Sequence, residues 1–129
     1  MQILLDTHAF IWWVLGDANL SLVARSHIDD ANNDCFVSAA SAWEVTTKYR
    51  LGKLPQAAQL AANFSEVVVQ QGFIPLALTI VHAARAGAFT QIHRDPFDRM
   101  IAAQALIDGM AVISIDPQLD QFGITRIWS

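Results

Sequence analysis

Four acidic residues lie at the ends of apolar segments, where a carboxylate is useful only if something nearby needs negative charge. They are Asp6 in LLDTH, Glu44 in SAWEV, Asp98 in DPFDRM and Asp116 in SIDP. Clustered carboxylate oxygens are hard ligands for Mg²⁺ or Mn²⁺, and Mg²⁺ keeps waters and substrate phosphates among its own ligands. If the fold brings these acids together, the expected activity is that of a metal-dependent nuclease.

Three of these acids also have an ordinary structural explanation, two as caps and one as an acid in the first turn of a helix. Asp6 and Asp116 follow apolar runs, and an aspartate there can cap the next helix, which is worth about 1 kcal/mol. Asp95 can cap a helix that starts with Pro96, which places Asp98 at the third helical position, where the helix dipole favours an acid. One of these two aspartates, Asp95 or Asp98, is therefore expected to be structural.

Glu44 is the more telling residue, because the chain has only two glutamates and this one lies between Trp43 and Val45. It could form an exposed ion pair with Lys48 one helical turn later, which is worth about 0.3–0.5 kcal/mol. Because its neighbours are apolar, partial burial of the Glu44 side chain is equally expected. A buried carboxylate needs a partner, and a metal ion could be that partner. The shared position of the four acids, rather than any one of them, indicates a site.

The apolar segments that must position these acids alternate between strand-like and helix-like patterns. Ile3, Leu4 and Leu5 form a wholly apolar run, which is typical of a strand buried on both faces of a parallel sheet. Further strands are predicted at 35–37, 73–74, 112–115 and 125–128, and helices at about 7–15, 20–32, 38–49, 57–71, 79–88 and 96–108. This alternation predicts an α/β fold with a parallel sheet, at whose carboxyl edge ligands bind.

The length of 129 residues predicts a single domain over residues 1–129 that buries most of its apolar surface. No apolar run reaches the roughly 18 residues of a membrane span, and the first basic residue, Arg25, lies too late for a secretory signal. The single cysteine, Cys35, cannot form an internal disulfide and fits a reducing compartment. We therefore expect a cytoplasmic protein with no membrane contact.

The net charge of −4, with only eight lysines and arginines, argues against a passive nucleic-acid binder, since phosphate contacts need basic residues. Bound divalent cations make the local charge of an acidic site positive, so the negative net charge does not exclude a nuclease. His93 and Arg94 could contact phosphate, although a solvent-facing loop is the favoured interpretation. Trp12 and Trp13 are expected to pack in the core or at a subunit contact rather than to stack on bases.

Other catalytic chemistries lack their residues. The four histidines show no HExxH spacing, and the phosphate loops GxxxxGK and GxGxxG are absent. A receiver domain would need a lysine after its last strands, but no lysine follows Lys53. A phosphatase of the haloacid-dehalogenase type would need an aspartate at position 8, where the chain has His8.

Four longer segments carry a family resemblance that covers nearly the whole chain. The strings LLDTHAFIWW, VSAASAWEVTTKYRLGKL, HRDPFDRMIAAQA and AVISIDPQLDQFGI resemble, in order, the motifs of PIN-domain ribonucleases, specifically VapC-type toxins of bacterial type II toxin–antitoxin systems. The resemblance implies a PIN-like three-layer α/β/α sandwich with a short parallel β-sheet. It also implies an Mg²⁺- or Mn²⁺-dependent endoribonuclease whose catalytic and metal-binding acids are Asp6, Glu44, Asp98 and Asp116.

The roles of these acids follow from the resemblance as a hypothesis. Asp6 and Asp98 would hold a divalent ion directly, whereas Glu44 and Asp116 would act through water or hold a second ion. The ion would acidify a water and offset charge in the transition state, and either Glu44 or Asp116 could orient that water. Asp95 is extra relative to the family pattern, so its role stays open.

Several neighbouring residues are expected to support the acids. Thr7 and Ser38 lie beside the site motifs and could donate hydrogen bonds to the carboxylates. Arg94 and Arg99 flank Asp98 in sequence and are the expected phosphate contacts.

The resemblance also implies partners: an RNA substrate, a cognate antitoxin whose tail covers the active site, and a second copy of the chain in a homodimer or higher oligomer. The competing interpretation is a catalytically silent PIN-fold module that acts only through protein partners. All four family acids are present, which weighs against that alternative.

Overall fold

The computed structural model describes residues 1–129, and its centre is a parallel sheet of five short strands. The strands are β1 (Gln2–Leu5), β2 (Asp34–Ser38), β3 (Ile74–Leu76), β4 (Ala111–Ile113) and β5 (Arg126–Ile127). Their order in the sheet is β3-β2-β1-β4-β5, and every pairing is parallel. The α/β fold expected from the alternating segments is confirmed.

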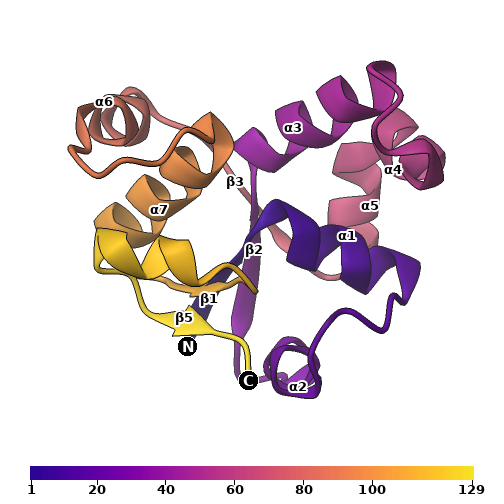
Figure 1. Cartoon of the computed structure of the whole chain (residues 1–129). Helices are drawn as coiled ribbons and strands as arrows, with labels where there is room; N and C mark the ends of the chain where they lie inside the picture. The colour runs from indigo at the N-terminus through magenta and orange to yellow at the C-terminus, as the bar shows by residue number, and fades with distance from the viewer.

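Helices cover both faces of this sheet, so the molecule has three layers (Figure 1). One side carries α1 (Thr7–Leu15), α2 (Leu22–Asp29), α3 (Ala39–Arg50), α4 (Ala58–Ala62) and α5 (Phe64–Gln70), with the 3₁₀ turn η1 (Pro55–Ala57) before α4. The other side carries α6 (Ile80–Ala88), α7 (Pro96–Asp108) and the 3₁₀ segment η2 (Pro117–Phe122). The α/β/α sandwich that the resemblance implied is confirmed.

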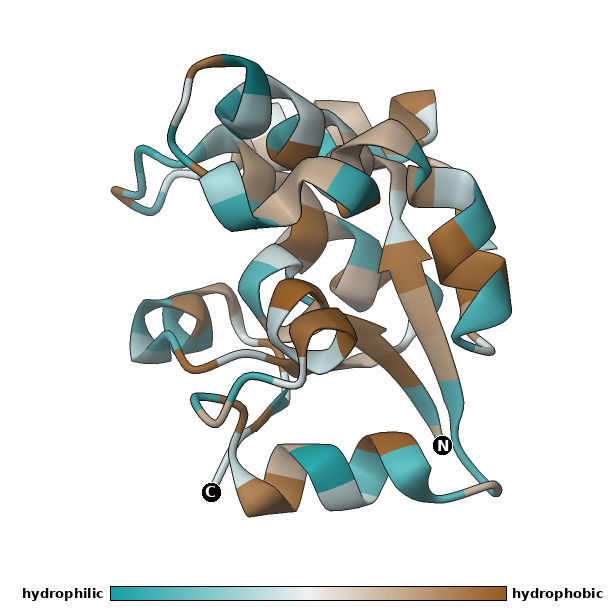
Figure 2. Ribbon diagram, turned by 90° about the vertical axis from the view of Figure 1, so that its right-hand side faces the viewer, coloured by the Kyte–Doolittle hydropathy of each residue, from teal (hydrophilic) through white to brown (hydrophobic).

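The side chains of β1 explain why its sequence is wholly apolar. Ile3 and Leu5 pack with Phe10 on the α1 side of the sheet, whereas Leu4 packs with Ile101 on the α7 side. All three strand residues are fully buried, because alternate residues of a strand point to opposite faces and both faces are covered. Figure 2 shows the result as brown, hydrophobic colour along the central strands and teal residues on the helices.

The expected helix at 57–71 is in fact two helices, α4 and α5, which meet at Asn63. Asn63 has a φ of −134° and a ψ of 39°, which is outside the helical region, and its side-chain amide donates to the Gln59 carbonyl at 3.3 Å. An asparagine that bonds to nearby backbone competes with helix continuation. The segment is helical as expected, but Asn63 divides it into two helices.

Two strands differ from expectation at their ends. β3 continues through Pro75, and this is tolerated because β3 is an edge strand whose outer side has no ladder partner. β4 ends at Ile113, two residues before the expected boundary, and Asp116 then starts the unpredicted η2. The helix ends at Gly16 and Gly109 agree with expectation, since both glycines adopt the left-handed C-cap conformation, with φ of 64° and 68°.

The strand order reverses between β1 and β4, and this reversal positions the site. From β1 the chain builds β2 and β3 on one side, whereas β4 and β5 lie on the other. A crevice opens at such a switch point, outside the carboxyl ends of the strands. Asp6 follows β1 and Asp116 follows β4, so both acids are brought to this crevice.

None of the helices has the length and hydropathy required to cross a membrane.

Candidate active site

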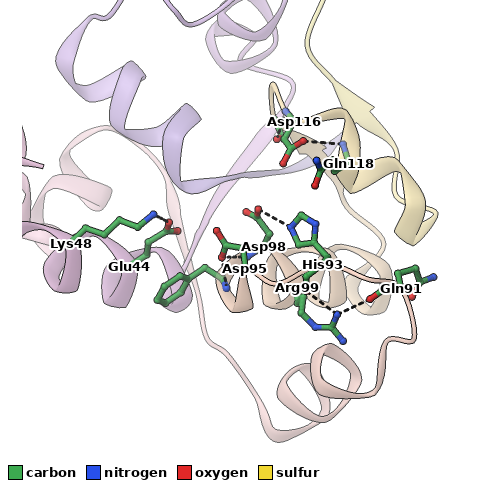
Figure 3. A network of polar contacts seen from close by, with 11 residues as sticks. Glu44, Lys48, Gln91, His93, Asp95, Asp98, Arg99, Asp116 and Gln118 are labelled. Carbon is green, nitrogen blue, oxygen red and sulfur yellow. Dashed lines mark hydrogen bonds and ion pairs between the residues drawn. The ribbon is translucent and has the colours of Figure 1, made fainter. Parts of the chain in front are cut away.

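Three of the four predicted acids line one cleft of about 390 Å³ at the switch point. Asp6 comes from the end of β1. Asp98 comes from the first turn of α7 and Asp116 from the turn after β4 (Figure 3). The other lining residues are His8, Trp12, Asp95 and Ile115. A larger surface hollow of about 530 Å³ lies on α2, but it contains none of the four predicted acids.

Asp6 is both a cap and a member of the cleft. One of its oxygens, Oδ1, accepts the Ala9 N–H at 2.8 Å and caps α1, which leaves the second oxygen free of the cap. The side chain is buried, and burial raises its pKa to about 6; hydrogen bonds from Ser114 and Ala9 oppose this shift, while Glu44 and Asp116 add to it. The two interpretations of Asp6 are therefore compatible.

Asp95 and Asp98 divide their roles as the capping pattern predicted. Asp95 Oδ1 accepts the N–H groups of Phe97 at 2.9 Å and Asp98 at 3.2 Å, so Asp95 is the N-cap of α7. Asp98 Oδ2 instead lies 3.1 Å from His93 Nε2. Burial raises the pKa of Asp98 to about 6; the hydrogen bond from His93 lowers it, and the charges of Asp95 and Asp6 raise it.

Asp116 completes a set of atoms that could hold a cation. Its Oδ1 accepts the Gln118 N–H at 2.9 Å and starts η2. Ligand atoms of His93, Asp98 and Asp116 all lie within 4.8 Å of one another. Ligands of one octahedral ion with bonds of about 2.0–2.1 Å lie about 3–4 Å apart, so these atoms would move slightly closer around an ion. Carboxylate oxygens are the donors that Mg²⁺ and Mn²⁺ prefer. The carboxylates of Asp98 and Asp116, with Asp6 in the same cleft, therefore fit a divalent ion by the chemistry of their donors.

Glu44 does not line the cleft, because its carboxylate is buried against a lysine on its own helix. The side chain is 3% exposed and forms an ion pair with Lys48 one turn later on α3 (Figure 3). The pair with Lys48 and the burial of Glu44 are thus confirmed together, whereas the expected exposure of that pair is wrong for Glu44. The Glu44 charge still raises the pKa of Asp6, so its electric field reaches the cleft.

Removing the lysine should leave this buried carboxylate without a partner. We expect Lys48→Met to lower the free energy of unfolding by about 1–2 kcal/mol, because the Glu44 carboxylate then remains desolvated and unpaired. Urea unfolding followed by circular dichroism measures the change, and Lys48→Arg is the matched control that keeps the charge. The Lys48→Met/Glu44→Gln double variant should recover most of the loss; equal losses in the single and double variants would contradict the expectation.

The hydrogen bonds predicted for Thr7 and Ser38 are wrong. The Thr7 hydroxyl bonds to the Ser41 hydroxyl at 2.9 Å, and the Ser38 hydroxyl donates to Gln104 Oε1 at 2.5 Å. Neither reaches a carboxylate; the Ser114 hydroxyl is the one that acts on Asp6. Thr7 and Ser38 instead tie α1 to α3 and β2 to α7 behind the cleft.

The residues beside Asp98 in the sequence have different surroundings in the structure. The Arg99 guanidinium donates to four backbone carbonyls and points away from the acids, so the predicted phosphate contact is wrong for this residue (Figure 3). Arg94 is exposed, and its phosphate contact stays a prediction. The solvent-facing interpretation of His93 is wrong, since its side chain is 6% exposed and contacts Asp98.

Sequence reasoning missed Ser114 as a site residue and gave His93 a different role, as a possible phosphate contact on a solvent-facing loop. Ser114 could have been found, because a hydroxyl at the end of the apolar run 111–113 must bond to something, and it lies two residues before Asp116. No local pattern indicated the contact of His93 with Asp98, since His93 lies in a segment without regular secondary structure. Trp12 packs against Trp128, as expected of a core residue, but it also lines the cleft.

A family model described as PIN domain matches residues 3–124 of the chain. The chain belongs to the PIN-domain family. Among its relatives, ribonuclease VapC16 of Mycobacterium tuberculosis is 38% identical over 64 residues, which cover 50% of this chain and 45% of that protein. The match therefore spans less than half the length of that relative. The resemblance of the sequence motifs to PIN-domain proteins of the VapC type is confirmed.

Solved structures show the same fold around this PIN domain's sheet. The structure of VapBC2 from Rickettsia felis, bound to a DNA fragment from its promoter, aligns with a TM-score of 0.72 at 12% identity and covers 100% of both chains. Mycobacterium tuberculosis VapC20, described as a sarcin–ricin loop cleaving toxin, aligns with a TM-score of 0.69 at 18% identity, covering 98% of this chain and 99% of the other. At these identities the likeness concerns the fold alone.

Proposed function

We propose that this PIN domain is a metal-dependent endoribonuclease and the toxin of a toxin–antitoxin pair. The observation that carries the proposal is the convergence of Asp6, Asp98 and Asp116 on one cleft at the switch point of the sheet. The names of its relatives, ribonuclease VapC16 and the sarcin–ricin loop cleaving toxin VapC20, support the same activity.

Asp6, Asp98 and Asp116 are the residues that would hold Mg²⁺ or Mn²⁺ in this cleft. When bound, the ion supplies positive charge against the developing charge of the phosphodiester and acidifies the attacking water. Asp116 is better placed than Glu44 to orient that water, because it lines the cleft while Glu44 is held by Lys48. Glu44 acts on Asp6 through its negative charge, which raises the pKa of the Asp6 carboxyl.

The distribution of charge supports RNA as the substrate, in spite of the net charge of −4. Residues 45–94 contain five of the eight basic residues and a single acid, Glu66. These basic residues are Lys48, Arg50, Lys53, Arg85 and Arg94, and all except Lys48 are exposed. A polyanion could thus be attracted to the region of α3 and α6 while the acids bind cations.

The partners of this PIN domain are also part of the proposal. The VapBC names of structural neighbours support an antitoxin partner, and we propose that it covers the cleft. Exposed apolar residues Ile80, Val81 and Ile92 on α6 and the following loop offer contact area for the antitoxin or for a second copy of the chain. We propose a single domain over residues 1–129 that acts as a homodimer or higher oligomer.

Incubation of the purified protein with total cellular RNA tests the proposed activity. We expect discrete fragments in Mg²⁺ or Mn²⁺ and none in excess chelator, because the clustered acids need a cation before they can act on a phosphodiester. Sequencing of the fragment ends would then identify the RNA and the bond that is cut. Fragments that persist in chelator would contradict a metal-dependent nuclease.

Expression in cells separates the nuclease from a silent binding module. Asp98→Asn should abolish toxicity while co-purification with the antitoxin persists, since the substitution is isosteric and removes only the charge. Asp29→Asn is the matched control, because Asp29 is exposed on α2, away from the cleft. Full toxicity of Asp98→Asn would favour action through protein partners.

A further inference from the structure

We propose that Arg99 and His93 are positioning residues that orient the Asp98 carboxylate through the loop between α6 and α7. The inference rests on the proposed function, because the orientation of Asp98 matters only if its free oxygen serves the cleft. Residues 90–94 belong to no helix or strand, so side chains must define the path of this loop.

Arg99 holds the loop by donating to four backbone carbonyls, three of them in the loop and one on α6. Its Nε donates to Ala86 at 3.0 Å, Nη1 to Gln91 at 3.0 Å and to His93 at 3.2 Å, and Nη2 to Phe89 at 2.6 Å. Only the planar guanidinium offers enough donors in a fixed geometry for such an arrangement; a lysine offers three on one flexible nitrogen. We call Arg99 and these four carbonyls the Arg99 clamp.

The clamp ends at His93, and His93 reaches the site. The imidazole is buried, and its ring packs edge-on against Phe122 of η2, with centroids 5.6 Å apart. Phe122 in turn packs against Phe89, whose carbonyl the clamp also holds, at 4.6 Å. The backbone and ring of His93 are therefore both held, and its Nε2 lies 3.1 Å from Asp98 Oδ2 (Figure 3).

A hydrogen bond from His93 to one oxygen fixes the rotation of the Asp98 carboxylate. Its second oxygen is then presented in a defined direction, towards the cleft that Asp98 shares with Asp6 and Asp116. Arg99 is the next residue after Asp98, yet it acts on it through the loop and His93 rather than by direct contact. Residues that orient ligands in this way typically change metal affinity or activity about 10–100-fold when they are replaced.

Three variants test this route: Arg99→Lys, His93→Leu and His93→Gln, with Arg25→Lys on α2 as the matched control. Mn²⁺ affinity is measured by calorimetry without RNA, and kcat and KM are measured on a cleaved RNA. We expect Arg99→Lys and His93→Leu each to weaken Mn²⁺ and Mg²⁺ binding about 10–100-fold and to lower kcat with little change in KM. His93→Gln should recover part of the loss, because its amide N–H can reach the same oxygen.

Two further measurements distinguish positioning from a purely structural role. Hydrogen exchange of the metal-free protein should show faster exchange of residues 89–95 in Arg99→Lys but not in Arg25→Lys. The double variant Arg99→Lys/His93→Leu should be no weaker in metal binding than the worse single variant, since both act along one route. Additive losses, or lower stability with unchanged metal affinity, would overturn the inference.

The role of the imidazole has its own discriminating result. A loss of Mn²⁺ affinity in His93→Leu without a loss of Mg²⁺ affinity would identify His93 as a metal ligand, because imidazole favours the softer ion, and would overturn the positioning role. Because metal binding is measured without RNA, the binding results do not depend on whether the protein cleaves RNA. A wild-type protein that binds metal but cuts no RNA would contradict the proposed function and still test the clamp.

Discussion

Asp6→Asn should abolish metal-dependent RNA cleavage and at the same time stabilise the metal-free protein. Asparagine has the shape of aspartate and can still accept the Ala9 N–H that caps α1. It lacks the charge, which burial disfavours and which the neighbouring Glu44 and Asp116 repel. We expect the cleavage rate to fall on the order of 10²-fold or more, as for the loss of a main electrostatic contact to a transition state.

Two experiments measure these opposite effects on the same protein. Cleavage of RNA in Mg²⁺ or Mn²⁺ reports the activity, and thermal melting at neutral pH, with and without the ion, reports the stability. The wild type should melt higher when the ion is added, whereas Asp6→Asn should melt higher than the wild type without it and respond little to it. Asp29→Asn, on exposed α2, should behave as the wild type in both assays. Cleavage that survives Asp6→Asn would point to a contaminating nuclease.

The metal-free protein should lose stability as the pH rises from about 4 to above 6, contrary to the usual behaviour of aspartates. Burial raises the pKa of both Asp6 and Asp98 to about 6, from an ordinary value of 3.8. The folded state therefore holds these protons more tightly than the unfolded state does. The resulting stabilisation is complete below pH 3.8 and is lost as the pH passes through about 6.

The size of the effect follows from the shift. For the buried Asp6, a difference of two pKa units corresponds to about 3 kcal/mol, and the contribution of the partly exposed Asp98 is smaller. The charges that act on these two groups are Glu44 and Asp116 on Asp6, and His93, Asp95 and Asp6 on Asp98.

Urea unfolding at pH 4.5 to 7.5 measures this dependence. In the presence of chelator, the free energy of unfolding should fall between pH 5 and 7. Asp6→Asn should remove most of this fall. Saturating Mn²⁺ should reverse the trend, because the ion binds the deprotonated carboxylates and competes with protons below pH 6. A metal-free stability that rises with pH across this window would show that Asp6 and Asp98 ionise normally.

Much of the fold was predictable because its determinants are short-range. The wholly apolar Ile3-Leu4-Leu5 indicates a strand covered on both faces, and both faces are covered. The cap and proline at Asp95-Pro96 set the start of α7 and place Asp98 in its first turn. Parallel strands have their carboxyl ends at one edge, so acids after β1 and β4 had to approach one another.

The identity of the residues behind the acids was decided by tertiary structure alone. Thr7 and Ser38 lie beside the site in sequence, yet they bond to Ser41 and Gln104. Such partners are 34 and 66 residues away along the chain, and no local pattern encodes them.

The sequence by itself thus determined the α/β sandwich, the cleft-side placement of Asp6, Asp98 and Asp116, and the capping role of Asp95. Periodicity and capping depend on residues within a few positions of one another, which a sequence displays directly. Tertiary structure alone decided that Arg99 faces the loop and that His93 reaches Asp98. The reason is that the path of an irregular loop is set by side-chain contacts that exist only after the helices have packed.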